Sequence, residues 1–495
     1  MTSDDPPHSR PRAAGWALGS GMIHQFSQVS VSLALAALLG PEAFGVIALA
    51  SIYVLLVEFL VRQGIVQAVI QRENLEARHM DAAFWMTMAT AAVLGLFTLA
   101  FAGTWADIND APRLRPLLIA LSGLGLFQAL WQVPTALFQR SLDFKRSEIP
   151  LNVGTVLGGV VGVAAAFLGA NEWAIVAQLY TYGVVGTVLL YRATSWRPAF
   201  RFSRRAAKDL LAVSTGALLA TLGSFFSQRA DSLLLGVFFG PLALGLYRLG
   251  ARFVQLIINV TSASLGRVAL AVLSREQGDP DKYARALRSQ LLGLNLLVFP
   301  ALGILLASGR SITLIFGSEW EPAGPALRIL CLAGLARGLV LFCSPILQSL
   351  GKAHRAAGTQ WFSAGVHIVF LVIGGVVLRD QDVATQITGV ATVRLLAQGV
   401  VITPTLLVVI SRATHVPVRS LLAPLVAPAA GAAAAIAVGL AVDEASLRAG
   451  VALLPTLMLV GATSTVAALG AVLTTSPHAR QLLAGLRDRP APVVR

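Results

Sequence analysis

Long apolar runs recur from one end of this chain to the other, and they limit the folds that it can adopt. A helix of about 20 apolar residues crosses a bilayer and satisfies its backbone hydrogen bonds within itself. Of the 495 residues, 56% are hydrophobic and 13% are charged, whereas a soluble domain carries about 25% charged residues. The sequence therefore predicts an all-α integral membrane protein with about fourteen transmembrane helices.

The predicted spans follow one another with short connections. They lie near residues 14–39, 43–65, 82–104, 116–138, 149–170, 172–192, 210–239, 242–266, 289–308, 324–350, 359–378, 384–410, 420–441 and 450–474. The polar start runs straight into the first span, which is longer than the apolar region of a signal peptide. We therefore expect no cleavable signal.

Positive charges gather on alternate connections of this predicted topology. With the N-terminus placed in the cytoplasm, 27 of the 38 Lys and Arg residues fall on the inside and five on the outside. This bias is that of the positive-inside rule and predicts that both termini are cytoplasmic. The net charge of +14 is thus explained by topology, and we expect no nucleic-acid partner. No pattern is typical of a metal site or a Gly-rich phosphate loop, so we expect no cofactor.

The chain repeats itself at an offset of 200 residues. Residues 17–49 and 217–249 are identical at 13 of 33 positions without a gap, and both contain Gly-Pro-x-Ala-x-Gly, beginning at Gly40 and Gly240. The proline suits the first turn of a helix, so each motif predicts two spans joined with almost no loop. Six spans separate the copies, which makes them parallel repeats. Transporters with repeated halves bind substrate between them and alternate access by rocking.

The repeat predicts a division of the chain. We expect two six-helix bundles at 1–194 and 210–412, joined by a basic cytoplasmic linker at 195–209. Basic and aromatic residues in this linker suit contact with anionic lipids, although they serve topology equally well. Residues 413–495 are expected to add two further transmembrane helices and a basic cytoplasmic tail.

Five segments resemble the polysaccharide transport family of the multidrug/oligosaccharidyl-lipid/polysaccharide exporter superfamily. They are LLGPEAFG at 38–45, ALFQRSLDFKR at 136–146, FFGPLALGLY at 238–247, FGSEWEPAGPALRIL at 316–330 and LQSLGKAHR at 347–355. The resemblance covers about residues 12–412. It implies a flippase of the bacterial inner membrane that moves undecaprenyl-pyrophosphate-linked oligosaccharides to the outer leaflet for surface polysaccharide biosynthesis, usually driven by an ion gradient. It also implies a polysaccharide polymerase and an initiating sugar transferase as partners.

Few ionisable residues lie inside the spans, where they are costly and often functional. Five of them are arginines placed deep in spans of the second half, namely Arg229, Arg248, Arg252, Arg337 and Arg394. Asp231 can neutralise only one of them by a salt bridge, so positive charge remains in excess. Because guanidinium groups bind phosphate oxygens in pairs, we predict a cationic cavity in which these arginines bind the pyrophosphate headgroup.

The first half has almost no matching cation, since Val29 stands at the position that Arg229 occupies in the second copy. We therefore predict that polar residues of the first half bind the sugars. These residues are Gln25, Gln28 and Gln132.

Three further residues are candidates for coupling transport to an ion gradient. They are His24, Glu58 and Asp231. Histidine titrates near neutral pH and can carry a proton. The alternative for Glu58 is a structural pair with Arg62, four residues later on the same helix.

Two other functions are alternatives to a flippase. A membrane polysaccharide polymerase or ligase needs a sizeable outer loop for its chemistry, and the longest outer connections, near 105–115 and 309–323, are too short. We therefore expect that the protein is not an enzyme. A multidrug exporter of the same superfamily remains the nearer alternative, although a cavity for cationic drugs would need acids rather than arginines.

Overall fold

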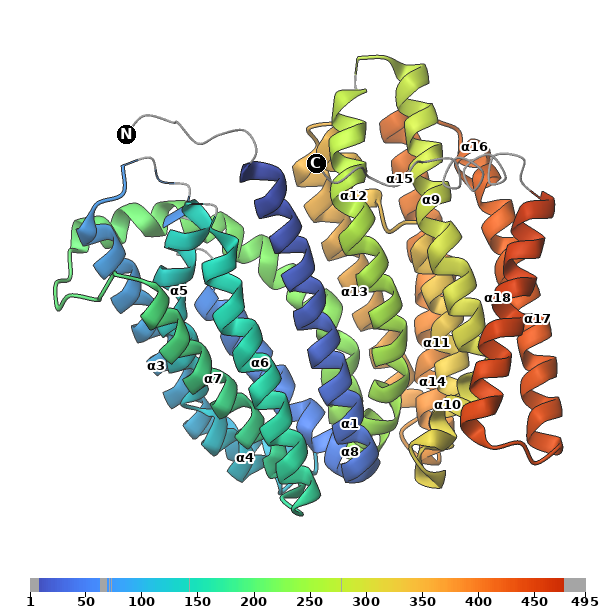
Figure 1. The fold of residues 1–495 in the computed structure, drawn as a ribbon, viewed down its shortest axis with the longest axis horizontal. Coiled ribbons are helices and arrows are strands. Elements are labelled where there is room, and N and C mark those ends of the chain that lie inside the picture. Colours follow the sequence, from blue (N-terminus) through green and yellow to red (C-terminus); the bar gives the residue numbers. More distant parts are fainter. Residues whose placement is uncertain are drawn as a thin grey trace, which may run out of the picture. The chain divides into compact units, whose positions relative to one another are not determined.

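The computed structural model describes residues 9–62, 69–70, 72, 74–141, 143–276 and 278–475. Side chains at 9–22, 62, 211–228, 262–268, 270–271 and 353 are outside this description. Every regular element in the described part is helical (Figure 1).

The helices follow the order of the predicted spans. They are α1 (Ser9–Arg62), α3 (Ala77–Ile108), α4 (Leu114–Leu121), α5 (Leu124–Arg140), α6 (Phe144–Phe167), η1 (Asn171–Trp173), α7 (Ala174–Ala193), α8 (Arg204–Arg275), α9 (Pro280–Ala307), α10 (Gly309–Ile315), η2 (Ser318–Trp320), α11 (Ala323–Gly338), α12 (Cys343–Ser349), α13 (Ala353–Val377), α14 (Val383–Leu396), η3 (Ala397–Ile402), α15 (Thr403–Thr414), α16 (Val418–Leu422), η4 (Ala423–Leu425), α17 (Val426–Arg448) and α18 (Leu453–Thr475). Among the described residues, 12 helical stretches are long and apolar enough to cross a membrane.

Two of these stretches, in α1 and α8, reverse direction and so contribute two spans each. Gly40 has φ 74° and ψ 169°, and Gly240 has φ 74° and ψ −174°. Only glycine adopts this backbone conformation readily, and the following prolines start the returning arms. Figure 1 shows α1 running to one end of the bundle and turning back. The prediction of about fourteen membrane helices with two loop-free hairpins is therefore confirmed.

The two hairpin turns contact each other reciprocally. A Cβ atom placed on Gly45 would overlap the carbonyl oxygen of Pro241, and one placed on Gly245 would overlap the carbonyl oxygen of Pro41. The helix backbones touch at this point, as glycine at a membrane helix interface permits. The same motif therefore forms both the turn and its packing surface.

The chain divides into two compact units, Met1–Arg248 and Leu249–Arg495. In the first unit, α6 packs along α7 through glycines spaced four residues apart. Gly158 and Gly162 lie against the backbone of Gln178 and Ala174, respectively. Small residues at this spacing line one helix face and let two membrane helices approach closely.

The connection before α8 is anchored to the first unit. The indole N–H of Trp85 donates a hydrogen bond to the carbonyl of Ala199 at 2.9 Å, and the backbone N–H of Ala199 donates to Asp81 at 3.1 Å. The basic linker predicted at 195–209 overlaps the first turns of α8, which begins at Arg204.

In the second unit, α17 packs against α9 and α18, and Figure 1 shows α17 and α18 side by side. Asp443 of α17 is 2% exposed, and Ser311 of α10 donates a hydrogen bond to it. Arg328 of α11 lies 3.8 Å from the same carboxylate. The polar contacts of the buried Asp443 therefore hold α17 to the rest of this unit.

Three predicted spans are interrupted, which the sequence reading did not anticipate. The span near 116–138 divides into α4 and α5, the span near 324–350 into α11 and α12, and the span near 384–410 contains the π-helix η3. Pro404 follows this π-helix. Proline has no N–H to donate to the carbonyl four residues earlier, so a regular α-helix cannot continue through it unchanged.

Candidate functional site

His24 lies between α1 and α6 in a chain of hydrogen bonds. Its Nε2 is 3.0 Å from the side-chain nitrogen of Gln28, and its Nδ1 is 3.1 Å from the hydroxyl oxygen of Thr155. The Thr155 hydroxyl in turn donates to the carbonyl of Leu151 at 2.9 Å. Because the amide nitrogen can only donate, Nε2 of His24 accepts and Nδ1 carries the proton. The arrangement therefore fits a neutral imidazole.

Glu58 and Arg229 come together although 171 positions separate them in the sequence. Both side chains are half-buried, and the Glu58 carboxylate acts electrostatically on the Arg229 guanidinium. The pair with Arg62 that the sequence suggested involves a side chain outside the described residues. An acid of α1 and a cation of α8, one residue from each repeat, thus lie within electrostatic range of each other.

Asp231 and Arg248 lie on the two arms of the α8 hairpin, near its turn. The hydroxyl of Tyr247 donates to Asp231 at 3.3 Å, and the guanidinium of Arg248 donates to the hydroxyl of Ser232 at 3.1 Å. Asp231 is 5% exposed. These cross-arm bonds give both residues a structural role in the hairpin.

The glutamines predicted to bind sugars differ in exposure. Gln28 is exposed and Gln25 is half-buried, both on α1. Gln132 of α5 is buried and donates to the carbonyl of Gln128 at 3.0 Å. Of the three, Gln132 is the least accessible to a sugar in this conformation.

In the second unit, Arg337 occupies the last turn of α11, and Arg394 the last turn of α14. These two helices pack against each other. His367 of α13 is 8% exposed and lies within electrostatic reach of Arg337. Within the described residues, neither ring nitrogen of His367 has a hydrogen-bond partner. Arg252 is half-buried on α8, one helical turn after Arg248.

Polar residues around η3 were missed by the sequence reading. The side chain of Gln398 donates to the hydroxyl of Thr403 at 3.0 Å, and this hydroxyl donates to the carbonyl of Ala336 at 3.0 Å. Ala336 directly precedes Arg337 in the chain, and Gln398 lies one helical turn after Arg394. A Thr-Pro pair within a predicted span was the only local signal for this cluster, and π-helical turns often occur at functional sites.

Comparison with known proteins identifies the family that this chain resembles. The family model described as "Polysaccharide biosynthesis protein" matches residues 34–325. The succinoglycan biosynthesis transport protein ExoT of Rhizobium meliloti (strain 1021) is 25% identical over 330 residues, which are 66% of this chain and 66% of that protein. The match thus spans just under two thirds of that relative.

A further relative and a solved structure are also similar to this chain. The lipopolysaccharide biosynthesis protein WzxC of Escherichia coli (strain K12) is 23% identical over 345 residues, or 69% of this chain and 70% of that protein. The solved structure titled "Lipid II flippase MurJ, inward closed conformation" aligns with a TM-score of 0.70 and 12% identity, over 95% of this chain and 99% of that one. At this identity the structural match shows the fold alone.

Proposed function

This chain belongs to the polysaccharide biosynthesis protein family, and we propose that it moves an anionic oligosaccharide linked to undecaprenyl pyrophosphate between the leaflets of a bacterial cell membrane. The chain is a multi-pass, all-helical membrane protein with the fold of the lipid II flippase. Its family consists of membrane transporters rather than enzymes. The proposed direction is from the inner to the outer leaflet, with both termini in the cytoplasm.

The charge imbalance of α11 to α15 carries this proposal. Residues 323–414 contain seven Lys and Arg residues and only two acids, Asp380 and Asp382, which both lie in the connection between α13 and α14. Arg337 and Arg394 lie inside the spans, on helices that pack together. A diphosphate offers oxygens that guanidinium groups bind in pairs, whereas a cationic drug would be repelled.

The repeat supports alternating access as the mechanism. We propose that Arg229, Arg248, Arg252, Arg337 and Arg394 bind the headgroup, while Gln25 and Gln28 bind sugars. Transporters with repeated halves expose such a site alternately to the two sides. Release on the outer side would pass the lipid-linked sugar to a polysaccharide polymerase, and an initiating sugar transferase would supply the carrier on the inner side.

The test combines deletion of the gene with complementation. Strains receive the wild type, Arg337→Ala, Arg394→Ala or the corresponding Lys variants, and surface glycan is measured beside lipid-linked oligosaccharide in the inner leaflet. We expect the Ala variants to lower export about tenfold or more at equal protein level, because each removes a charged hydrogen-bond donor. Arg379→Ala, which changes an exposed arginine outside the spans, is the matched control and should export normally.

The possible results distinguish an error in the proposed arginine site from an error in the proposed transport function. Normal export by both Ala variants would remove Arg337 and Arg394 from the substrate site while leaving a flippase. A deletion strain with unchanged lipid-linked sugars would contradict the function and favour export of another amphiphile.

A further inference from the structure

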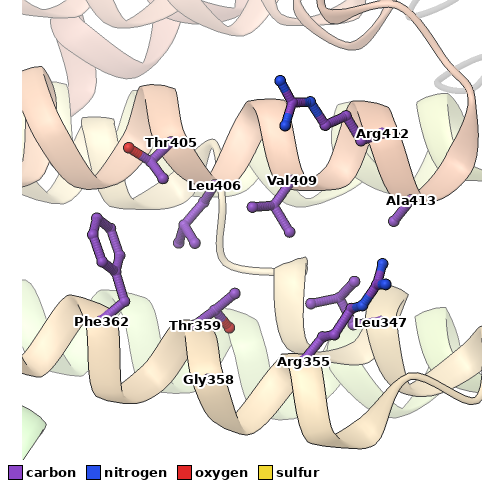
Figure 2. Close-up of a pocket in the computed structure, with 10 residues that line it drawn as sticks. All are labelled: Leu347, Arg355, Gly358, Thr359, Phe362, Thr405, Leu406, Val409, Arg412 and Ala413. Carbon is purple, nitrogen blue, oxygen red and sulfur yellow. The ribbon is translucent and has the colours of Figure 1, made fainter.

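The second unit contains an open groove at one end of its helices. The walls come from the end of α12, the first half of α13 and the second half of α15, and the cavity measures about 320 Å³. Figure 2 shows Arg355, Arg412 and Ala413 at one end of the groove, and Phe362 and Thr405 at the other. All walls belong to one compact unit, so the groove is formed entirely within that unit.

Most of the lining is apolar. Leu347 and Leu406 are buried, and the side chains of Val409 and Phe362 extend the apolar surface. Gly358 leaves the α13 wall open, since a Cβ atom at this position would meet no other atom within 4 Å. An apolar chain lying in the groove would be removed from contact with water, which is favourable.

One end of the groove is strongly positive. Arg355 and Arg412 are exposed, and no described carboxylate forms an ion pair with either of them. The ammonium group of Lys352 donates to the carbonyl of Ala413 at 3.3 Å, which adds a third positive charge at this end. No Asp or Glu occurs in α12, α13 or α15. The charges therefore attract an anion to this end.

The dimensions suit an amphiphile with an anionic head. Seven residues separate Arg355 from Phe362 and Thr405 from Arg412, which is about 10 Å along each helix. The positive-inside rule places both arginines on the cytoplasmic side, at the level of lipid headgroups. The positive end of the groove therefore lies at the depth of the lipid headgroups, and its apolar part extends from there into the membrane.

We propose that this groove binds an anionic phospholipid of the cytoplasmic leaflet. Its phosphate lies between Arg355 and Arg412, and the first part of one acyl chain lies along Leu406 and Val409. Basic pockets between membrane helices on the cytoplasmic side suit anionic headgroups, and guanidinium groups bind phosphate oxygens in pairs. A resident phospholipid fits better than the transported lipid, because these arginines lie at exposed helix ends and not in mid-span.

Native mass spectrometry of the purified full-length protein tests this site. The protein is titrated with phosphatidylglycerol or with phosphatidylcholine of the same acyl chains. We expect one phosphatidylglycerol to bind about tenfold more tightly than phosphatidylcholine, since charged hydrogen bonds favour the anionic head. The double variant Arg355→Ala/Arg412→Ala should lose this preference, and Arg310→Ala/Arg379→Ala, which changes two exposed arginines outside the groove, should keep it.

A second variant distinguishes the loss of lipid binding from a folding defect. Gly358→Leu fills the groove but keeps both arginines, so it should also abolish the tightly bound phosphatidylglycerol while retaining the wild-type melting temperature in phosphatidylcholine. Unchanged phosphatidylglycerol affinity in either the double variant or Gly358→Leu would overturn the proposal. Displacement of phosphatidylglycerol by an equal concentration of undecaprenyl diphosphate would overturn the choice of occupant. Neither readout depends on export, so failure here leaves the proposed transport function untouched.

Discussion

The hairpins of α1 and α8 have the same backbone geometry but different charges. Gly40 and Gly240 share a φ of 74°, and the two turns pack against each other through equivalent glycines. Beyond the turns, Val29 in the first copy corresponds to Arg229 in the second, and Ile52 corresponds to Arg252. The turn residues are thus shared because backbone geometry requires them. The charges of Arg229 and Arg252 are not shared, so the geometry of the turn does not require them.

The largest effect is expected from breaking the shared turn contact. Gly45→Ala and Gly245→Ala each place a Cβ atom onto a carbonyl oxygen of the other hairpin, so each should lower the free energy of unfolding by about 3 kcal/mol. Thermal unfolding of the purified protein measures the loss. Gly461→Ala is the control, because its Cβ would meet no atom within 4 Å. A loss at only one of the two hairpin glycines would show that the contact is not reciprocal in solution.

The next largest effect on stability is expected from Arg229 of the second repeat, whose charge interacts with Glu58 of the first. Arg229→Ala removes the cation that faces Glu58, so we expect a loss of about 2 kcal/mol in unfolding free energy. Arg229→Lys keeps the charge and should lose less. Adding Glu58→Gln to Arg229→Ala should recover part of the loss, because the acid is then neutral. Strictly additive effects in this double-mutant cycle would mean that the two side chains are not coupled.

A smaller effect is expected at His24. His24→Ala breaks the bonds to Gln28 and Thr155, which should cost about 1 kcal/mol of unfolding free energy. If His24 couples proton movement to transport, the same variant should also flatten the pH dependence of export near neutral pH. Thr155→Val, which keeps the imidazole, is the matched control. An unchanged pH profile in His24→Ala would assign the residue to packing alone.

The smallest effect on stability is expected at the N-terminus of α14. Its counterpart is α7, the helix at the same place in the first repeat. Asp382 caps α14 by accepting hydrogen bonds from the side chain and the backbone N–H of Thr385, and these bonds lower the pKa of the Asp382 carboxyl. Because the folded pKa is depressed, this contribution to stability is present above the unfolded pKa of about 3.9 and is lost as pH falls through the folded pKa. No side chain caps α7.

Melting temperatures of Asp382→Ala and Asp382→Asn test this cap. Asp382→Ala should melt slightly lower than the wild type at neutral pH, with the difference disappearing in acid. Asparagine can cap without titrating, so Asp382→Asn should be nearly neutral. Equal destabilisation of both variants at every pH would exclude the carboxylate as the source.

The number and order of the spans were predictable because membrane helices depend on local composition. About twenty apolar residues suffice for each span, and the Gly-Pro pair marks each reversal. The interruptions within spans were less visible. The π-helix η3, for example, precedes Pro404, and the effect of a proline within a helix depends on tertiary support. The predicted arginines lie on helices as expected, but their role as a substrate site stays a prediction.

Contacts between distant residues could not be derived from the sequence. A pair of Glu58 with Arg62 is visible in the sequence because the two lie four residues apart on one helix, whereas Arg229 comes within electrostatic range of Glu58 only through folding. In the sequence, the positive-inside rule alone is enough to explain Arg355 and Arg412, so nothing marks them as a binding site. Their common groove requires α13 and α15 to lie side by side, which no local pattern specifies.

The π-helix η3 sets the angular phase of the helix that follows it. Arg394 and Arg412 are 18 residues apart, so an unbroken α-helix would complete about five turns between them and align both side chains on one face. A π-turn accommodates about one additional residue, which rotates everything after it by roughly 100°. Whether residues 397–402 form a π-turn or a regular α-helix therefore decides whether the two arginines lie on different faces or on one. Conversion of this turn to a regular α-helix, with no residue removed, would rotate all of α15, and with it one wall of the groove.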